Sequence, residues 1–252
     1  MVGGRVHFSA MRRLILKEKE ERRMLRGHLW VYRNEIASKL DDLSEGETVD
    51  VAAHNGRFVG RGYYQSHGGI AVRILSAHEE SIDAGFFAER LAEARAFREQ
   101  LYPGQTTYRW LFGESDGLPG FIADRYGAVV TVQTQCVYYG LHAETIANAF
   151  LETDGVEGVA FQVGDEGIAY GTVPDDIECE VEGMNLGFAL EVSQKTGLFL
   201  DQRDNWAQIA PFAKGARVFD GHCYAGAWSV YSAKHGATEV LGVDSTQAAP
   251  DA

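Results

Sequence analysis

Two aspartates, Asp220 and Asp244, each close a short apolar run near the end of the sequence. A turn containing Gly226 and a helical pattern separate the two runs, and a strand, turn, helix and strand of this length form a right-handed unit with parallel strands. In nucleotide-binding units of this kind, an acidic residue about 20 positions on accepts hydrogen bonds from ribose hydroxyls. The spacing therefore predicts that Asp244 binds the ribose of a cofactor. The simpler alternative is that both aspartates cap turns between strands and helices.

The turn between these aspartates bears on the kind of cofactor. It reads CYAGA over residues 223–227 and lacks the three glycines that let a backbone approach a pyrophosphate. A dinucleotide-dependent oxidoreductase is therefore a disfavoured alternative. S-adenosylmethionine (SAM) carries a sulfonium and an amino-acid tail in place of a pyrophosphate, so it does not need that fingerprint.

Three regions must position these residues. Short alternating strands between glycine-containing turns predict a small β-barrel over residues 11–80. Residues 81–193 predict a linking helix and a mixed α+β domain with a largely antiparallel sheet. Residues 194–252 contain the parallel unit and predict the start of a doubly wound domain. The fold class is thus multidomain, α/β and α+β.

The linking helix has its own pattern. Ser81 is the expected N-cap, with Asp83 in the first turn. Apolar residues then recur at helical spacing and are expected to face the core: Phe87, Leu91, Ala94, Phe97 and Leu101.

Composition excludes several classes of protein. The chain has 252 residues, of which 45% are apolar and 11% aromatic, which is enough to bury real cores. No run approaches the roughly 18 apolar residues of a membrane helix, and no secretory signal opens the chain, so a cytoplasmic location is expected. The histidines show no spacing typical of a metal site. Three widely spaced cysteines predict reduced thiols: Cys136, Cys179 and Cys223.

Charge is distributed unevenly around a net value of -13. Residues 1–75 hold 13 Lys and Arg against 9 Asp and Glu, a balance of +4, whereas the remainder holds 10 against 27, a balance of -17. Basic excess at one end indicates a surface that faces phosphates, although an ordinary solvated face is the alternative. The candidate RNA contacts in this region are Arg26, His28, Arg61 and Arg73.

Six ordered segments of the sequence are together more specific than any single glycine pattern. These segments are QKTGLFLDQRDN at 194–205, FDGHCYAGAWSVYSAKHGA at 219–237, GVDS at 242–245, LRGHLWVYRNEI at 25–36, GRFVGRGYYQSHGGIAVRIL at 56–75 and FGESDGLPGFIADRYG at 112–127. In all of them the chain resembles the RlmI-type family of SAM-dependent methyltransferases, which modify cytosine C5 in large-subunit ribosomal RNA. The chain departs from the family pattern at Gly221 and His222. It also departs at Ala225 and Ala227, where the loss of a threonine hydroxyl and of a glycine weakens the expected cofactor affinity.

The resemblance implies a role for each region. The barrel would be a PUA-like RNA-binding domain, and the last region would begin a class I, Rossmann-like methyltransferase domain. SAM would be the cofactor, and large-subunit ribosomal RNA the partner. The residues implied to hold the cofactor are Lys195, Thr196, Gln202, Arg203, Asp220, Tyr224, Gly226, Asp244 and Ser245.

Catalysis itself is expected to need more than this chain. Methylation of cytosine C5 requires a thiolate that attacks C6, and no cysteine here matches the family's catalytic position, so the nucleophile is expected beyond Ala252. The chain would then be a fragment with little activity, or another chain would supply the missing part. An RNA-binding module without catalytic activity is the alternative. An exposed edge of the parallel strands predicts self-association.

Overall fold

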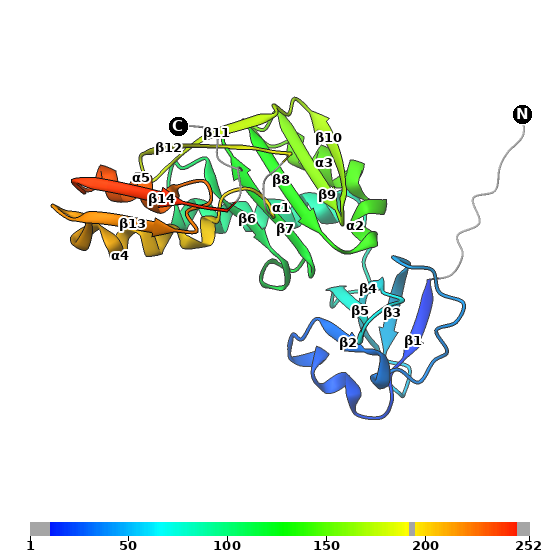
Figure 1. The fold of residues 1–252 in the computed structure, drawn as a ribbon. Helices are drawn as coiled ribbons and strands as arrows, with labels where there is room; N and C mark the ends of the chain where they lie inside the picture. Colours follow the sequence, from blue (N-terminus) through cyan, green and yellow to red (C-terminus); the bar gives the residue numbers. More distant parts are fainter. Residues whose placement is uncertain (1–10, 192–194, 246–252) are drawn as a thin grey trace, which may run out of the picture.

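The computed structural model describes residues 11–191 and 195–245. Figure 1 shows three groups of elements: a barrel at one end, a central sheet with helices, and a C-terminal unit at the other end. The predicted residues Val192 and Gln194 lie outside the described residues.

The N-terminal barrel contains five strands in the order β1-β3-β4-β5-β2. An antiparallel bridge between Leu16 and Ile36 joins the chain after β1 to the chain after β2, which closes the sheet. Val31, Val49 and Val72 are among the fully buried residues inside it. The predicted barrel is confirmed, with strands β1 (Arg12–Ile15), β2 (Trp30–Tyr32), β3 (Thr48–Ala52), β4 (Phe58–Tyr64) and β5 (Ile70–Ser76).

The central sheet has the order β10-β9-β8-β7-β6. All neighbours are antiparallel except β8 and β9, which the helical connection α2–α3 joins as a parallel pair. Helices α1 and α3 cover one face over an aromatic core that includes Trp110, Phe121 and Phe150. The elements are α1 (Ala84–Leu101), β6 (Thr107–Phe112), β7 (Phe121–Tyr126), β8 (Val129–Thr134), α2 (Val137–Leu141), α3 (Ala143–Leu151), β9 (Gly158–Val163) and β10 (Glu166–Gly171). Strand β10 was not predicted from the sequence.

Helix α1 differs from the prediction at both ends. Its N-cap is Asp83, not Ser81, because the Asp83 carboxylate accepts a hydrogen bond from the backbone N–H of Phe86 at 3.2 Å. Phe97 and Leu101 are exposed, and the buried stripe ends instead on Arg98. The reason is electrostatic: Arg98 donates two hydrogen bonds to Asp116, at 2.5 and 2.7 Å, and therefore turns inward.

A β-hairpin covers part of the other face of the central sheet. Its strands are β11 (Asp176–Val181) and β12 (Met184–Ala189). Strand β11 was not predicted from the sequence, and β12 begins two residues before the strand predicted from Leu186. Ile177 and Phe188 of the hairpin belong to one buried cluster with Tyr126 and Val129 of the sheet. The hairpin therefore forms the second layer.

The C-terminal unit confirms the predicted strand, helix and strand. It consists of α4 (Arg203–Ala213), β13 (Arg217–Gly221), α5 (Ala227–Lys234) and β14 (Glu239–Val243). Strands β13 and β14 pair in parallel, and α5 packs against both of them. Phe219, Leu241 and Val243 remain exposed on these strands.

Two further findings concern the described residues alone. Within 11–191 and 195–245, no helix is both long and apolar enough to cross a membrane. Across the same ranges, no group of three His, Cys, Asp or Glu side chains lies close enough to hold a metal ion.

Candidate functional site

The carboxyl ends of β13 and β14 bring four of the predicted residues together. Asp244 follows β14, and its carboxylate accepts a hydrogen bond at 2.9 Å from the backbone N–H of Tyr224 in the turn after β13. Asp220 accepts a hydrogen bond at 2.7 Å from the Ser229 hydroxyl of α5. Gly226 has φ +74° and is the N-cap of α5, a left-handed conformation that glycine adopts without strain. The two aspartates therefore fix the turn and lie where open parallel sheets bind ligands.

A second segment, residues 195–201, lies beside this turn, and we call it the anchoring loop. The Lys195 ammonium lies 5.1 Å from the ring centroid of Phe199. The Phe199 ring in turn lies 5.1 Å from the ring of Tyr224. These contacts connect the loop that carries Lys195 to the turn that carries Tyr224. Ser245 is exposed directly after Asp244.

The central sheet holds the anchoring loop in place. The Thr196 side chain is buried, and its hydroxyl donates to Asp124 of β7 at 2.5 Å. The Thr131 hydroxyl of β8 donates to the Thr196 carbonyl at 2.6 Å, and the Tyr126 hydroxyl donates to the Leu198 carbonyl at 3.2 Å. The loop that carries Lys195 is thus fixed by neighbouring strands of another layer.

Gly197 allows this close approach. It has φ +116°, and an added Cβ would lie 2.3 Å from the Phe188 ring. Any other residue there would have to displace a buried aromatic side chain of the hairpin.

Asp124 is the charged centre of this anchor. Arg109 donates two hydrogen bonds to it, at 2.9 and 3.0 Å, and the carboxylate is fully buried. Burial raises the pKa of the Asp124 carboxyl above its ordinary value, while the bonds from Arg109 act in the opposite direction. An unpaired carboxylate would be costly here, so the three side chains Arg109, Asp124 and Thr196 form one unit.

Arg203, predicted at the edge of the cofactor pocket, has a structural position. Its side chain is buried and donates to the Thr107 carbonyl at 3.0 Å and to Gln105 at 3.1 Å, and it pairs with Glu182. The guanidinium also lies 3.8 Å from the centroid of the Tyr102 ring. These contacts connect α4 to the central sheet and direct Arg203 away from the turn.

Gln202 stays near the anchoring loop. Its amide donates to the neighbouring Asp201 at 3.0 Å and accepts from Asn205 at 3.1 Å. Both contacts are local and belong to the start of α4.

The barrel residues predicted to contact RNA differ in their surroundings. Arg61 pairs with Asp50 at 2.7 Å, and Arg73 pairs with Glu114 at 3.0 Å. His28 accepts a hydrogen bond at 3.1 Å from the backbone N–H of Trp30, so it orders its own loop. Arg26 is exposed and makes no ion pair within the described ranges.

Glu114 also links the barrel to the central sheet. The Trp30 indole N–H donates to its carboxylate at 2.7 Å. With the Arg98–Asp116 pair, this contact gives both carboxylates of the turn between β6 and β7 structural partners.

The cysteines are free thiols in this structure, in agreement with the sequence. Burial raises the pKa of Cys179 to about 11 and also raises the pKa of Cys223, where Asp220 and Asp244 act in the same direction. A nucleophilic cysteine needs the opposite shift, so neither thiol has the surroundings of a nucleophile.

Sequence reasoning missed Arg109, Asp124 and Thr131. The available signal was a set of polar residues inside strands that are otherwise apolar. A buried Asp within a β-strand demands a charged or hydroxyl partner, and that demand is the observation to look for.

Comparison with known proteins gives these features a family context. The PUA-like domain family matches residues 14–77, which contain most of the barrel. The protein named ribosomal RNA large subunit methyltransferase I from Shewanella amazonensis is 35% identical over 255 residues, which cover 95% of this chain and 64% of that protein. The protein of the same name from Shewanella denitrificans is 38% identical over 251 residues, which cover 92% of this chain and 62% of that protein. The chain therefore spans about 62–64% of the length of these relatives.

Solved structures share the fold. A candidate SAM-dependent methyltransferase from Streptococcus mutans superimposes with a TM-score of 0.79 at 21% identity. The superposition covers 94% of this chain and 64% of the Streptococcus mutans chain. A candidate methyltransferase in complex with S-adenosylhomocysteine gives a TM-score of 0.81 at 21% identity, over 94% of this chain and 63% of its own.

The fold is accordingly multidomain, with a PUA-like barrel, a mixed α+β sheet and a Rossmann-like unit. By sequence, the chain is similar to the ribosomal RNA large subunit methyltransferase I proteins in the part of their length that it spans.

Proposed function

We propose that this chain is the RNA-binding and cofactor-binding part of a SAM-dependent methyltransferase that acts on large-subunit ribosomal RNA. The observation that carries the proposal is the position of Asp244, which a backbone N–H of the βα turn holds at the carboxyl end of β14 beside the Phe199–Tyr224 contact. The relatives' names support the substrate class. A location in the cytoplasm follows from a ribosomal substrate.

The donor set fits SAM chemically. Carboxylates accept hydrogen bonds from ribose hydroxyls and attract an ammonium, which suits Asp244 and Asp220 respectively. The rings of Phe199 and Tyr224 offer apolar faces to an adenine and to a sulfonium. When bound, SAM would supply an electrophilic methyl group, and these residues would bind and orient it. Lys195, Thr196, Gln202, Gly226 and Ser245 would surround the same surface, with Arg203 acting through the docking of α4.

We assign the segments 11–80, 81–193 and 194–252 to RNA binding, linkage and cofactor binding. In the barrel, Arg26 is the strongest candidate for a phosphate contact because its guanidinium is exposed. Arg61 and Arg73 would contribute less, since Asp50 and Glu114 already neutralise them. His28 would act by ordering the loop that presents Arg26.

Calorimetric titration tests the cofactor. SAM should bind with measurable heat, and Asp244→Ala should weaken binding about 10-fold or more, because a hydrogen bond to a charged group contributes about 1.5–3 kcal/mol. Asp204→Ala is the matched control, since Asp204 is an exposed carboxylate in the first turn of α4. Tight binding of NAD, or an equal loss in both variants, would contradict the proposal.

A gel shift with large-subunit ribosomal RNA tests the barrel. Binding should weaken as salt rises, and Arg26→Ala should reduce both the affinity and the slope of that dependence. Arg61→Gln serves as a comparison because Arg61 is already paired. Absence of RNA binding at low salt would contradict the RNA-binding part of the proposal and would not affect the cofactor-binding part.

Self-association belongs to the same proposal. Phe219, Leu241 and Val243 are exposed on a two-stranded parallel sheet, which has open edges. Sedimentation velocity should therefore show a concentration-dependent dimer that Leu241→Lys abolishes. A monomer at all concentrations would contradict this part alone.

A further inference from the structure

One row of the central sheet is open, although the next row on the same face is covered. Phe112 pairs with Ile122, Ile122 pairs with Gln133, and Gln133 pairs with Gln162, so these four residues stand side by side across β6, β7, β8 and β9. All four are exposed or half-buried. We call this row the open row.

The next row on the same face is covered by the anchoring loop. Asp124 and Thr131 are register partners on β7 and β8, two residues along from Ile122 and Gln133, and both hold the anchoring loop through Thr196. The loop therefore crosses the sheet directly beside the open row. A cavity of about 310 Å³ lies between them, and its lining includes Phe112, Ile122, Gln133, Lys195, Phe199 and Asp201.

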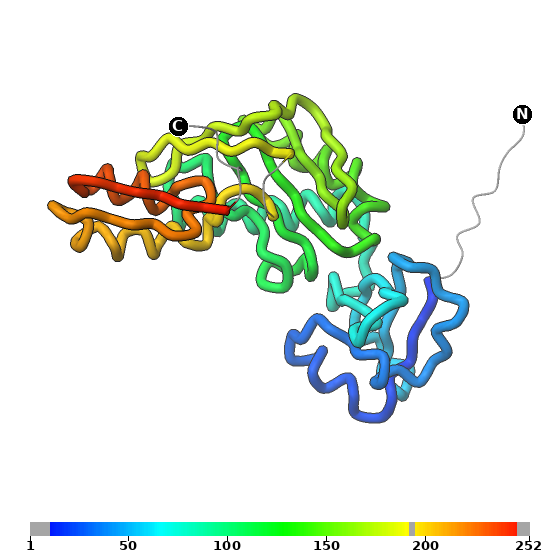
Figure 2. The backbone as a smooth tube through the Cα atoms, in the orientation of Figure 1, coloured from blue at the N-terminus to red at the C-terminus, as the bar shows by residue number. Residues whose placement is uncertain are grey.

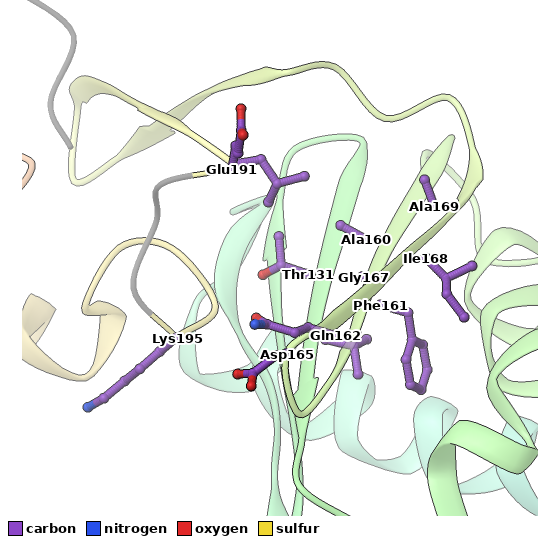
Figure 3. A pocket seen from close by; sticks show the side chains of 12 residues that line it. Thr131, Ala160, Phe161, Gln162, Asp165, Gly167, Ile168, Ala169, Glu191 and Lys195 are labelled. Carbon is purple, nitrogen blue, oxygen red and sulfur yellow. The ribbon is translucent and has the colours of Figure 1, made fainter. Parts of the chain in front are cut away.

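Figure 3 shows the neighbouring hollow over β8–β10, on the other side of Lys195. Thr131, Gln162 and Asp165 point into that hollow, whereas the Lys195 side chain extends away from it (Figure 3). Its ammonium lies over the Phe199 ring instead. The cation is thus directed toward the cavity that contains Phe112.

The lining of the 310 Å³ cavity has the chemistry of a nucleobase site. Phe112 and Phe199 provide aromatic faces for stacking, and stacking tolerates any base. The Gln133 amide both donates and accepts hydrogen bonds, and the Asp201 carboxylate accepts them from an exocyclic amine. Lys195 supplies a positive charge for a phosphate. A flat polar ligand with an attached phosphate satisfies all of these groups.

The cavity also lies between the two sites already described. Phe199 contacts Tyr224 of the βα turn on one side. On the other side, Phe112 precedes the turn whose Glu114 bonds to Trp30 of the barrel. Figure 2 shows the same order, with the barrel and the C-terminal unit on either end of the central sheet. A strand of RNA bound to the barrel would cross the open row before it reaches the cofactor.

We propose that the open row and the anchoring loop form a platform for single-stranded RNA, with an unstacked nucleotide held between Phe112 and Phe199. The proposal rests on the function proposed above, because the nucleotide in this cavity is the one presented to the cofactor. It assigns to the central sheet a substrate-binding role, in addition to its role as a link.

Fluorescence anisotropy with a labelled six-nucleotide oligocytidylate tests the platform on the whole chain. Phe112→Ala should weaken binding at least 5-fold, because base stacking on an aromatic side chain is worth that much or more. Phe97→Ala is a closely matched control: Phe97 is 52% exposed and Phe112 is 51% exposed, and each ring has an arginine guanidinium within 5.5 Å. Phe97→Ala should change binding less than 2-fold.

Ultraviolet cross-linking of the unaltered chain to oligouridylate gives a second measurement that does not depend on a variant folding. Peptides that contain Phe112 or Phe199 should carry the cross-linked nucleotide. Cross-links confined to the barrel, equal losses in Phe112→Ala and Phe97→Ala, or no oligonucleotide binding would each overturn the platform. Titration with SAM alone decides the cofactor site separately, so the two failures are distinguishable.

Discussion

The central sheet and the C-terminal unit bury their side chains in different ways. The central sheet has helices on one face and the β11–β12 hairpin and anchoring loop on the other. In the C-terminal unit, α5 packs against both strands, while Phe219, Leu241 and Val243 remain exposed. The first region has its own core, and the second has little of one.

The C-terminal unit has few buried apolar residues. Within the described part of 203–245 they are Trp206, Ala213, Tyr224 and Tyr231. Trp206 and Tyr231 belong to the same cluster as Phe188 of the hairpin. The unit is therefore stabilised mainly by docking onto the layer that also fixes the anchoring loop, and cofactor geometry depends on that docking.

Two tryptophans give the largest test of this difference. Trp110 is fully buried in the core under α1, and Trp206 is fully buried at the docking surface. Each change to alanine should cost about 3–5 kcal/mol. Trp110→Ala should raise hydrogen exchange across β6–β10, whereas Trp206→Ala should raise it across 203–245 and leave β6–β10 protected.

The two regions do not differ in this way if Trp206→Ala unfolds the central sheet as well. Equal exchange in both regions would mean that the hairpin, the sheet and the C-terminal unit form one cooperative block. Thermal unfolding of the two variants would then show a single shared transition.

Two arginines in the C-terminal unit give a smaller test. Arg203 is buried and bonds to the central strands, whereas Arg217 pairs with Glu239 at the surface. Arg203→Gln should cost about 1–3 kcal/mol, because the buried Thr107 carbonyl loses a charged donor. Arg217→Gln should stay within about 0.5 kcal/mol. Hydrogen exchange in α4, measured at increasing urea concentration, gives the stability loss in each of the two variants.

Similar costs for the two arginines would show that docking does not depend on the Arg203 network. In that case the apolar contacts of Trp206 alone would hold the unit. A loss in Arg203→Gln that also weakens SAM binding would connect docking to the cofactor site.

The regular elements of both regions could be predicted because their signals are local. Alternation and glycine turns located the barrel strands, and the apolar runs before Asp220 and Asp244 located β13 and β14. Strand β10 escaped because it is mostly exposed and has glycine at two of its six positions. Strand β11 does alternate, with Ile177, Cys179 and Val181 inward, but its outward acidic residues resemble a solvated segment.

The site was predictable only in part, for a different reason. Tyr224 and Asp244 lie in one unit with a known spacing, so the sequence places them together. Asp124 and Thr196 are 72 residues apart and meet only because β7 and β8 pair in one register beneath the anchoring loop. Long-range pairing of this kind leaves no periodic signal, and the open row was missed with it.

The smallest expected effect concerns acid stability in the central domain. His142 lies 4.6 Å from the Tyr138 ring and 5.8 Å from the Phe87 ring, and burial lowers its pKa below the ordinary 6.5. A group with a lowered folded pKa contributes stability that is present above pH 6.5 and is lost as the pH falls through the folded pKa. Urea unfolding should therefore show the central domain weakening below pH 6.5.

His142→Gln should reduce that loss, and His54→Gln, at an exposed position of the barrel, should leave it unchanged. Because the C-terminal unit docks onto the central domain, acid should loosen it only after the sheet beneath it has weakened. Exchange in 203–245 that rises at a higher pH than exchange in β6–β10 would show that the unit has an acid-sensitive contact of its own, and that its docking does not follow the central core.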